Sequence, residues 1–197
     1  MNIPISSFLR TAANCQAGRL ARGFTLIELM IVLAVASVLL GTAVPAITST
    51  IKSVQLSSAS NNLLAGLLLA RSEAVKRNGR GVICKSADGA TCTASGGWEQ
   101  GWLVFHDADN DGSRAVGEAI VQNVQPLAGD LRVKGNLSVA RYISYGADGG
   151  TRFASGGFQA GTITLCLRSA DAGEARQIIV SSSGRPRVQK TRVEACV

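Results

Sequence analysis

The apolar residues of this chain gather near its N-terminus. Residues 24–44 read FTLIELMIVLAVASVLLGTAV, an apolar run with one charged side chain, Glu28. A helix of about 20 apolar residues spans a bilayer. The preceding residues contain three arginines and no acidic residue. Because positive charge keeps its flank of a membrane helix in the cytoplasm, we expect the remainder of the chain on the far side of the membrane, in the periplasm of a Gram-negative cell.

Two simpler explanations of the apolar run are a secretory signal peptide and an ordinary membrane anchor. A signal peptide needs a small-residue cleavage site after the run, and residues 43–46, Ala-Val-Pro-Ala, match one only loosely. Neither explanation accounts for Glu28, because an isolated carboxylate inside hydrocarbon costs several kcal/mol. A third interpretation places Glu28 harmlessly near the membrane interface.

Two further patterns follow the apolar run. Small and apolar residues recur at three- and four-residue intervals through 46–77, which predicts an amphipathic helix that continues the apolar one for ~80 Å in all. Asn78-Gly79 is a helix stop. Beyond it, short apolar runs separated by glycine-rich loops predict antiparallel strands. We expect them near 80–85, 100–106, 118–125, 130–134, 139–145, 161–168, 176–182 and 186–193. The fold class is therefore α+β, with one long N-terminal helix packed on antiparallel β-sheet.

Composition removes several classes of function. The chain has 197 residues, of which 46% are hydrophobic and 17% charged, so it is not a disordered chain. It has one histidine and five cysteines, and it contains no CxxC, HExxH, GxSxG or GxxxxGK[ST] pattern. Zinc, hydrolase and nucleotide-binding functions are therefore weakly supported, and we expect a protein that is not an enzyme.

The residues around Glu28 carry a family resemblance. Residues 22–29, RGFTLIEL, resemble the class III signal of type IV pilins and type II secretion pseudopilins. The resemblance implies cleavage by a prepilin peptidase after Gly23, N-methylation of Phe24, insertion in the inner membrane and assembly with other pilins into a filament. Glu28 then becomes the fifth mature residue, where the family carries its acid, and Pro45 falls where pilins carry a helix-kinking proline.

Physical chemistry agrees with these roles. In a filament, Glu28 can meet the N-terminal ammonium of a neighbouring Phe24, a pairing that offsets two desolvated charges. Pro45 removes one backbone donor and bends the helix. The expected organisation is a leader over 1–23, a transmembrane helix over 24–45, an amphipathic half-helix over 46–79 and a β-rich periplasmic domain over 80–197. Loss of the leader's three arginines leaves 17 basic and 13 acidic residues, a net charge of +4.

Four cysteines remain after the leader, which contains Cys15. An even number in an oxidising compartment indicates disulfides, and three pairings are possible. We favour Cys84–Cys92, which closes a short local loop, and Cys166–Cys196, which ties the C-terminal strand to the sheet. A redox-active pair is disfavoured because no CxxC is present.

An acidic loop supplies one candidate metal site. Residues 107–118 match the calcium-loop pattern D-x-D-x-D-G-x5-E in full. Its oxygen ligands would come from Asp107, Asp109, Asp111 and Glu118. The flanking segments look like strands and not like EF-hand helices, so a plain polar hairpin loop is the alternative. No cofactor other than calcium is expected.

The C-terminal segment carries a second resemblance. Residues 178–188, IIVSSSGRPRV, look like the closing hairpin of the GspH/FimT subfamily of minor pilins. Members on the FimT side carry a Gly-Arg-x-Arg motif that binds DNA during natural transformation. Here the matching residues are Gly184, Arg185 and Arg187, and Lys190 and Arg192 add two cations. Guanidinium groups about 7 Å apart on one strand suit the phosphates of double-stranded DNA.

Three interpretations stay open at this stage. The first is a minor pilin of a type IV pilus that binds DNA for uptake through Arg185 and Arg187. The second is a type II secretion pseudopilin with a role in filament assembly and no DNA binding, in which the arginines are a solvated strand edge. The third is a calcium-stabilised, adhesin-like pilin.

Overall fold

The computed structural model describes residues 23–127, 129–169 and 171–196, without the side chains of 42–46. The chain divides into two compact units, Met1–Pro45 and Ala46–Val197, and each is considered by itself. Residues 1–22 of the predicted leader, which include Cys15, and the side chain of Pro45 lie outside what the structure describes. The helix α1, Leu26–Arg77, contributes to both units.

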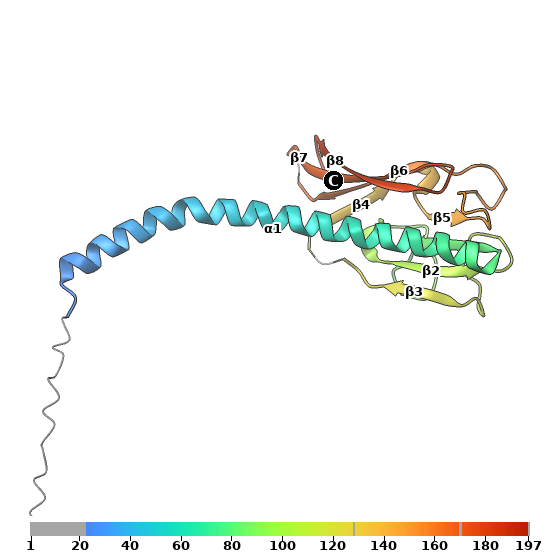
Figure 1. Cartoon of the computed structure of the whole chain (residues 1–197), viewed down its shortest axis with the longest axis horizontal. Helices are drawn as coiled ribbons and strands as arrows, with labels where there is room; N and C mark the ends of the chain where they lie inside the picture. Colours follow the sequence, from blue (N-terminus) through green and yellow to red (C-terminus); the bar gives the residue numbers. More distant parts are fainter. Residues whose placement is uncertain (1–22, 128, 170, 197) are drawn as a thin grey trace, which may run out of the picture. The chain divides into compact units, whose positions relative to one another are not determined.

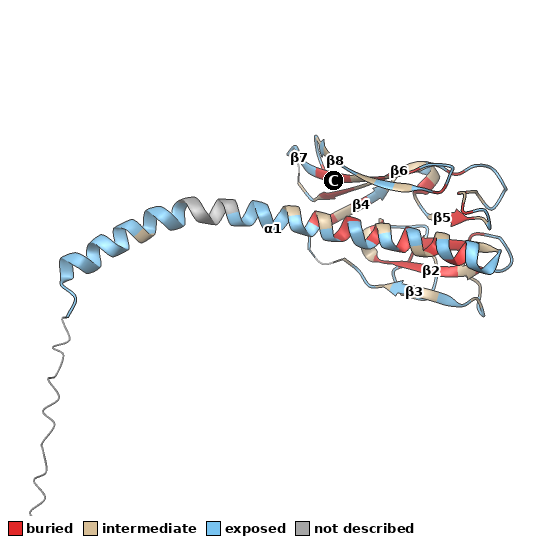
Figure 2. Cartoon of the chain, viewed as in Figure 1, coloured by how far each residue is buried: buried red, intermediate tan, exposed pale blue. Residues whose placement is uncertain are grey.

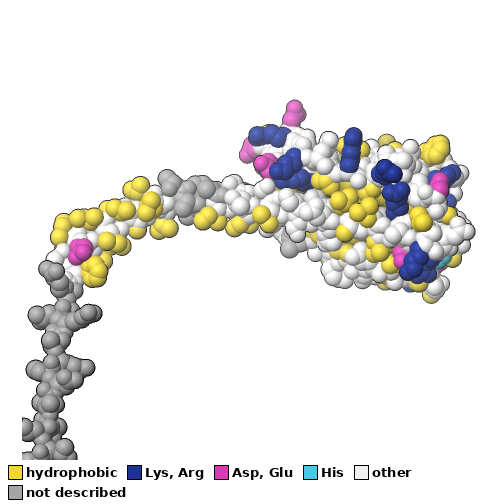
Figure 3. Space-filling model, viewed as in Figure 1, with side chains coloured by type: hydrophobic (Ala, Val, Ile, Leu, Met, Phe, Trp, Pro, Cys, Tyr) yellow, Lys and Arg dark blue, Asp and Glu magenta, His cyan; other side chains and the backbone are white. Residues whose placement is uncertain are grey.

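The first unit holds the start of α1. Within the described residues, none of the helices combines the length and the apolar character that crossing a membrane requires. The apolar side chains of this unit are nevertheless well exposed, and Figure 3 shows them along the described part of the unit, beside one acidic side chain.

The second unit begins with the amphipathic part of α1, which has one buried face. The buried residues recur at three- and four-residue intervals, as the sequence pattern predicts. Figure 2 shows them as a red stripe along α1, and they are Leu56, Ala59, Ser60, Leu63, Gly66, Leu67, Ala70, Glu73 and Ala74. The helix ends where Asn78 adopts a left-handed conformation with a φ of 49°. The N–H of Gly79 then bonds to the carbonyl of Ala74 at 3.0 Å, which closes the helix end.

In the described part of the chain, eight strands form two antiparallel sheets (Figure 1). The first sheet has the order β3-β2-β1-β5 and the second has the order β4-β6-β7-β8. The strands are β1 (Arg80–Lys85), β2 (Trp102–Asp107), β3 (Ile120–Val124), β4 (Leu131–Gly135), β5 (Tyr142–Tyr145), β6 (Gly161–Leu167), β7 (Gly173–Val180) and β8 (Pro186–Val193). Two short 3₁₀ turns, Trp98–Gln100 and Leu137–Val139, complete the described secondary structure. The α+β prediction of a long helix with antiparallel sheet is confirmed.

One hydrophobic core joins the helix to both sheets. Leu63 and Leu67 of α1 belong to the same buried cluster as Trp102 of the first sheet and Ile163 and Ile178 of the second. Burying such side chains contributes roughly 1.5–3 kcal/mol each relative to leaving them in water. Among the residues whose burial the structure describes, the buried hydrophobic ones all lie between Leu56 and Cys196. The unit Ala46–Val197 therefore contains a complete core and can fold alone.

Both favoured disulfides are present. Cys84–Cys92 closes a loop after β1, with a sequence separation of 8. Cys166–Cys196 joins β6 to the C-terminal segment, with a separation of 30. Cys196 also pairs its backbone with Ser169 in an isolated bridge. The C-terminal segment is thus held to the second sheet by a covalent bond and by hydrogen bonds.

Two basic residues are buried, which the sequence pattern did not predict. Arg176 on β7 is 3% exposed, and its Nη2 lies 3.3 Å from Ser53 Oγ and 3.4 Å from Ser57 Oγ on α1. Lys85, at the end of β1, is also 3% exposed, and its Nζ donates to the carbonyl of Gly96 at 2.7 Å. Burial lowers the pKa of Lys85. Both side chains attach surrounding segments to the sheets.

Candidate functional sites

The predicted processing site lies at the start of α1. Gly23 precedes the helix without regular secondary structure, and Phe24 is 82% exposed. Thr25 stands immediately before the helix, and its Oγ1 accepts a hydrogen bond from the backbone N–H of Glu28 at 3.3 Å. Thr-x-x-Glu is the sequence of a helix capping box, and an acidic side chain in the first turn interacts favourably with the positive end of the helix dipole. The observed bond uses the backbone of Glu28, and its acidic side chain lies in the first turn of the helix.

The acidic loop connects β2 to β3. Asp107 is the last residue of β2 and is only 1% exposed, and its Oδ2 accepts a bond from the N–H of Gly112 at 2.9 Å. Glu118 spans the loop, because its two carboxylate oxygens accept from the N–H groups of Ala108 at 2.6 Å and Ala115 at 2.8 Å. Gly112 takes a φ of 78°, a conformation that glycine adopts without strain. The loop is thus closed by its own carboxylates.

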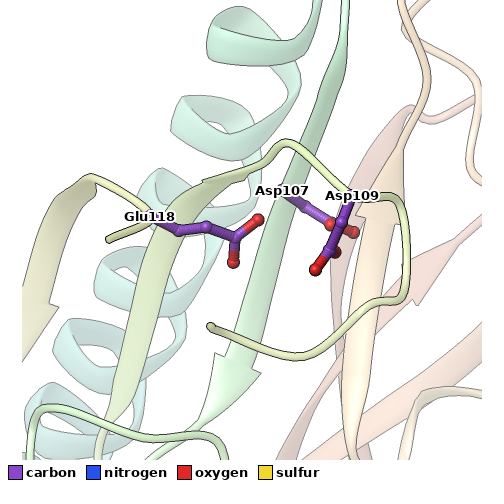
Figure 4. Close-up of side chains that lie close together, drawn as sticks. All are labelled: Asp107, Asp109 and Glu118. Carbon is purple, nitrogen blue, oxygen red and sulfur yellow. The ribbon is translucent and has the colours of Figure 1, made fainter. Parts of the chain in front are cut away.

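Three of the four predicted ligands come together. One carboxylate oxygen from each of Asp107, Asp109 and Glu118 lies within 4.8 Å of the others, and Figure 4 shows the three side chains. Asp111 is not part of this group, and its Oδ1 accepts from the N–H of Ser113 at 2.6 Å. Burial, together with the neighbouring carboxyls of Asp109 and Glu118, raises the pKa of Asp107 to about 6.

The C-terminal basic residues follow the turn between β7 and β8. Within the described strands, β8 pairs only with β7, so it forms an edge of the second sheet. The register is regular, with Arg187 opposite Ile179, Lys190 opposite Arg176 and Arg192 opposite Glu174. Successive side chains of a strand point to opposite faces. Arg187 therefore lies on one face of β8, and Lys190 and Arg192 lie on the other.

The two pairs of cations differ in the residues that lie across from them on β7. Arg185 and Arg187 are exposed, and no ion pair within the described residues involves either of them. Lys190 and Arg192 are exposed as well, but Arg192 lies directly across from the carboxylate-bearing Glu174. The register thus separates the predicted DNA-binding cations by position: Arg187 lies on one face of β8, and Lys190 and Arg192 lie on the other, across from Arg176 and Glu174, which form an ion pair with each other.

Gly184 is fixed by packing. It is buried, has a φ of 73°, and a Cβ at this position would overlap the carbonyl oxygen of Gly149. The two loops are held together by Thr151, whose N–H donates to Ser182 O at 3.1 Å and whose Oγ1 donates to Ser181 O at 2.9 Å. The glycine is required here for close backbone approach, and it sets the position from which Arg185 emerges.

Comparison with known proteins agrees with this architecture. A family model described as type II transport protein GspH matches residues 59–184, and one described as the prokaryotic N-terminal methylation motif matches residues 18–44. The crystal structure of the type IV minor pilin FimU from Pseudomonas aeruginosa strain PAO1 has a TM-score of 0.54 at 22% identity. The structural match covers 74% of this chain and 98% of the FimU chain. The minor pseudopilin EpsH of Vibrio cholerae has a TM-score of 0.47 at 14% identity, covering 68% of this chain and 96% of EpsH. The search of curated proteins gave no match.

The fold and the N-terminal motif define a type IV pilin-like protein, that is, a minor pilin or pseudopilin. Because the GspH model covers well over half of the sequence, the chain belongs to the GspH family. The resemblance to type IV pilins and pseudopilins and to the GspH family is confirmed, and the GspH match ends at Gly184, before Arg185 and Arg187.

Proposed function

We propose that this chain is a non-enzymatic minor subunit of a type IV pilus that captures double-stranded DNA. In this proposal a prepilin peptidase cleaves after Gly23, Phe24 is methylated, residues 24–45 anchor the subunit in the inner membrane, and the β-rich domain lies in the periplasm until assembly. The N-terminal methylation motif over 18–44 and the oxidised cysteines support this location.

The exposed apolar side chains of the first unit support assembly with other subunits. Large apolar residues such as Leu26, Met30 and Leu33 are at least 60% exposed. Contiguous exposed apolar surface marks contact with a membrane or with another protein. Lipid first, and neighbouring helices of the filament later, would cover this surface. Glu28 would then pair with the terminal ammonium of Phe24 in an adjacent subunit.

The DNA-binding part of the proposal depends on one observation: Arg185 and Arg187 are exposed without an acidic partner at an edge strand. Pro186 between them fixes its own φ and favours an extended Arg185. In an extended chain the two Cα atoms are about 7 Å apart, which is near the spacing of phosphates along one strand of DNA. Contacts of this kind are independent of base sequence. Few contacts per subunit give weak binding, and several subunits in one filament would compensate by avidity.

The separation of the cations by β8 allows a charge-matched test. The fragment 46–197, with both disulfides formed, would be titrated with double-stranded DNA at several salt concentrations. We would compare R185A/R187A with K190A/R192A, because both variants lose two positive charges. The slope of log K against log salt is negative, and each lost phosphate contact reduces its magnitude by about 0.9. R185A/R187A should therefore reduce the magnitude of the slope by about 1.8. The K190A/R192A variant should keep most of the affinity and slope.

Two results would contradict DNA capture by this motif. One is the absence of binding at low salt, and the other is an equal loss in the two variants, which would indicate only general electrostatic attraction. Thermal unfolding of each variant would show whether it is folded.

The alternative is a type II secretion pseudopilin that assembles filaments and binds no DNA. A specific observation favours it: Gly184 is explained by its contact with Gly149, so a glycine here needs no ligand. The family model that matches most of the domain also bears the description of a type II transport protein. In that case the exposed arginines discourage pairing of β8 with other strands. Absence of DNA binding by the intact fragment would favour the role of a type II secretion pseudopilin in filament assembly.

A further inference from the structure

The loop between β2 and β3 contains more negative charge than its surroundings balance. The carboxylates of Asp107, Asp109 and Glu118 each place an oxygen within 4.8 Å of the other two (Figure 4). The one ion pair that the described residues provide is from Arg80, whose Nε lies 3.9 Å from Asp107 Oδ2. Like charges at this separation repel one another, and a bound cation removes the repulsion.

A buried oxygen without a partner points to the same place. Asp107 Oδ1 is buried and has no hydrogen-bond partner, whereas Oδ2 of the same carboxylate accepts from Gly112. An unsatisfied buried carboxylate oxygen is costly, and native structures rarely leave one without a compensating ligand. The buried oxygen belongs to the residue that occupies the first position of the calcium-loop pattern. Geometry and sequence pattern thus agree on one residue, Asp107.

The other two carboxylates are positioned by the backbone of the loop. Both oxygens of Glu118 accept backbone N–H bonds, from Ala108 and Ala115, so the side chain is held across the loop from Asp109. Each carboxylate oxygen has two lone pairs, so these bonds leave Glu118 able to bind a metal ion. The loop therefore holds its carboxylates close together before any cation arrives.

We propose that Asp107, Asp109 and Glu118 bind a calcium ion that fastens the β2–β3 loop. Carboxylates and backbone carbonyls are hard oxygen ligands, and no histidine or cysteine belongs to the cluster. Calcium accepts six to eight oxygens in irregular arrangements, whereas magnesium demands near-ideal octahedral geometry and is seldom held by protein groups alone. Asp111, at the fifth position of the pattern, stays outside the ligand set. The site is independent of Arg185 and Arg187 and does not depend on DNA binding.

Calcium-dependent thermal stability is the test. The fragment 46–197 would first be freed of metal with a chelator and then unfolded at increasing calcium up to about 10 mM, above the ~1 mM dissociation constants of the weakest extracellular sites. A ligand at ten times its dissociation constant should raise Tm by roughly 3–6 °C for a domain of this size. Magnesium would be titrated in parallel, and calorimetric titration with calcium would measure binding directly.

Matched variants connect the effect to the site. Asp107→Asn and Asp109→Asn each remove one charge from the cluster, and Asp171→Asn removes one exposed charge elsewhere in the domain. We expect the calcium-induced rise in Tm to persist in Asp171→Asn and to disappear in both cluster variants. Asp109 is exposed, so its variant remains informative even where loss of the buried Asp107 prevents folding. No shift with calcium, an equal shift with magnesium, or an undiminished shift in Asp109→Asn would overturn the proposal.

Discussion

Replacing Gly184 with alanine should destabilise the domain through a steric contact in the folded state. Two costs add at this position. The first is a left-handed backbone conformation, with a φ of 73°, which costs about 1 kcal/mol for a residue with a side chain. The second is overlap of the new methyl group with the backbone of Gly149 and Gly150. Backbone atoms cannot rotate away as a side chain can, so the two loops must separate.

Gly156 provides a control that isolates the second cost. It also has a left-handed φ, 89°, but a Cβ there would have nothing within 4 Å. Gly156→Ala should therefore cost about 1 kcal/mol, the conformational term alone. Overpacking typically adds 1–3 kcal/mol, so Gly184→Ala should cost about 2 kcal/mol more than the control. For a domain of this size that difference lowers Tm by about 4–8 °C.

The assay is thermal and urea unfolding of the fragment 46–197 carrying each substitution. Equal destabilisation by the two alanines would refute the reasoning, because it would show that the loops yield to the methyl group without cost. The result also bears on the basic motif. If Gly184→Ala weakens DNA binding only as far as it unfolds the domain, the glycine acts by positioning Arg185 and not by contacting DNA.

Three further predictions concern the core, a disulfide and an ion pair. Leu67→Ala should cost about 2–5 kcal/mol in urea unfolding, whereas Leu68→Ala should cost much less, because Leu67 is fully buried and Leu68 is 47% exposed; similar costs would contradict the packing. Replacing both Cys166 and Cys196 with serine should lower the free energy of unfolding by about 3.6 kcal/mol, the chain-entropy value for a loop of 30 residues. An unchanged midpoint of urea unfolding would argue against this stabilisation by the disulfide. The hydrogen bond and ion pair with Arg77 lower the pKa of Glu73, so Glu73→Gln should reduce the free energy of unfolding at neutral pH. The difference in the free energy of unfolding between the variant and the unmodified domain should shrink as the pH falls below about 4.5. A pH-independent difference would exclude this linkage.

The order of helix and strands could be predicted from the sequence because the local signals agree. The three- and four-residue spacing predicts a helix to 77, and the structure ends α1 at Arg77. All eight expected strands are found, with bounds that differ by a few residues. The run 139–145 begins three residues too early, because its first residue belongs to a 3₁₀ turn and the strand begins at Tyr142. Such turns satisfy backbone groups locally and leave little trace in the hydrophobic pattern.

Strand pairing could not be predicted, because it depends on contacts between distant segments. Nothing local distinguishes β4, which joins the second sheet, from β3 and β5, which join the first. The burial of Arg176 was equally inaccessible, since an arginine in an alternating strand normally marks the wet face. Its partners Ser53 and Ser57 lie more than a hundred residues away on α1.

The candidate sites show the same division. The spacing of acids in 107–118 was visible in the sequence, but only the structure shows that Asp111 turns to Ser113 while Asp107 keeps a buried oxygen without a partner. The spacing of basic residues on β8 was visible as well. Its division between two faces required the strand register, and the packing of Gly184 required knowledge of a loop 35 residues earlier in the chain.

The interleaved order of the two sheets has a consequence for how the domain can come apart. Because β4 of the second sheet lies between β3 and β5 of the first along the chain, neither sheet is a continuous piece of polypeptide. No single cut can separate the two sheets, because a chain ending after Tyr145 would contain the first sheet together with β4, which would lack its neighbour β6. The helix and both sheets also share one core, so partial opening exposes the apolar interior of both sheets. The unit Ala46–Val197 should therefore unfold in a single cooperative transition, without a populated, partly folded intermediate that could interfere with filament assembly.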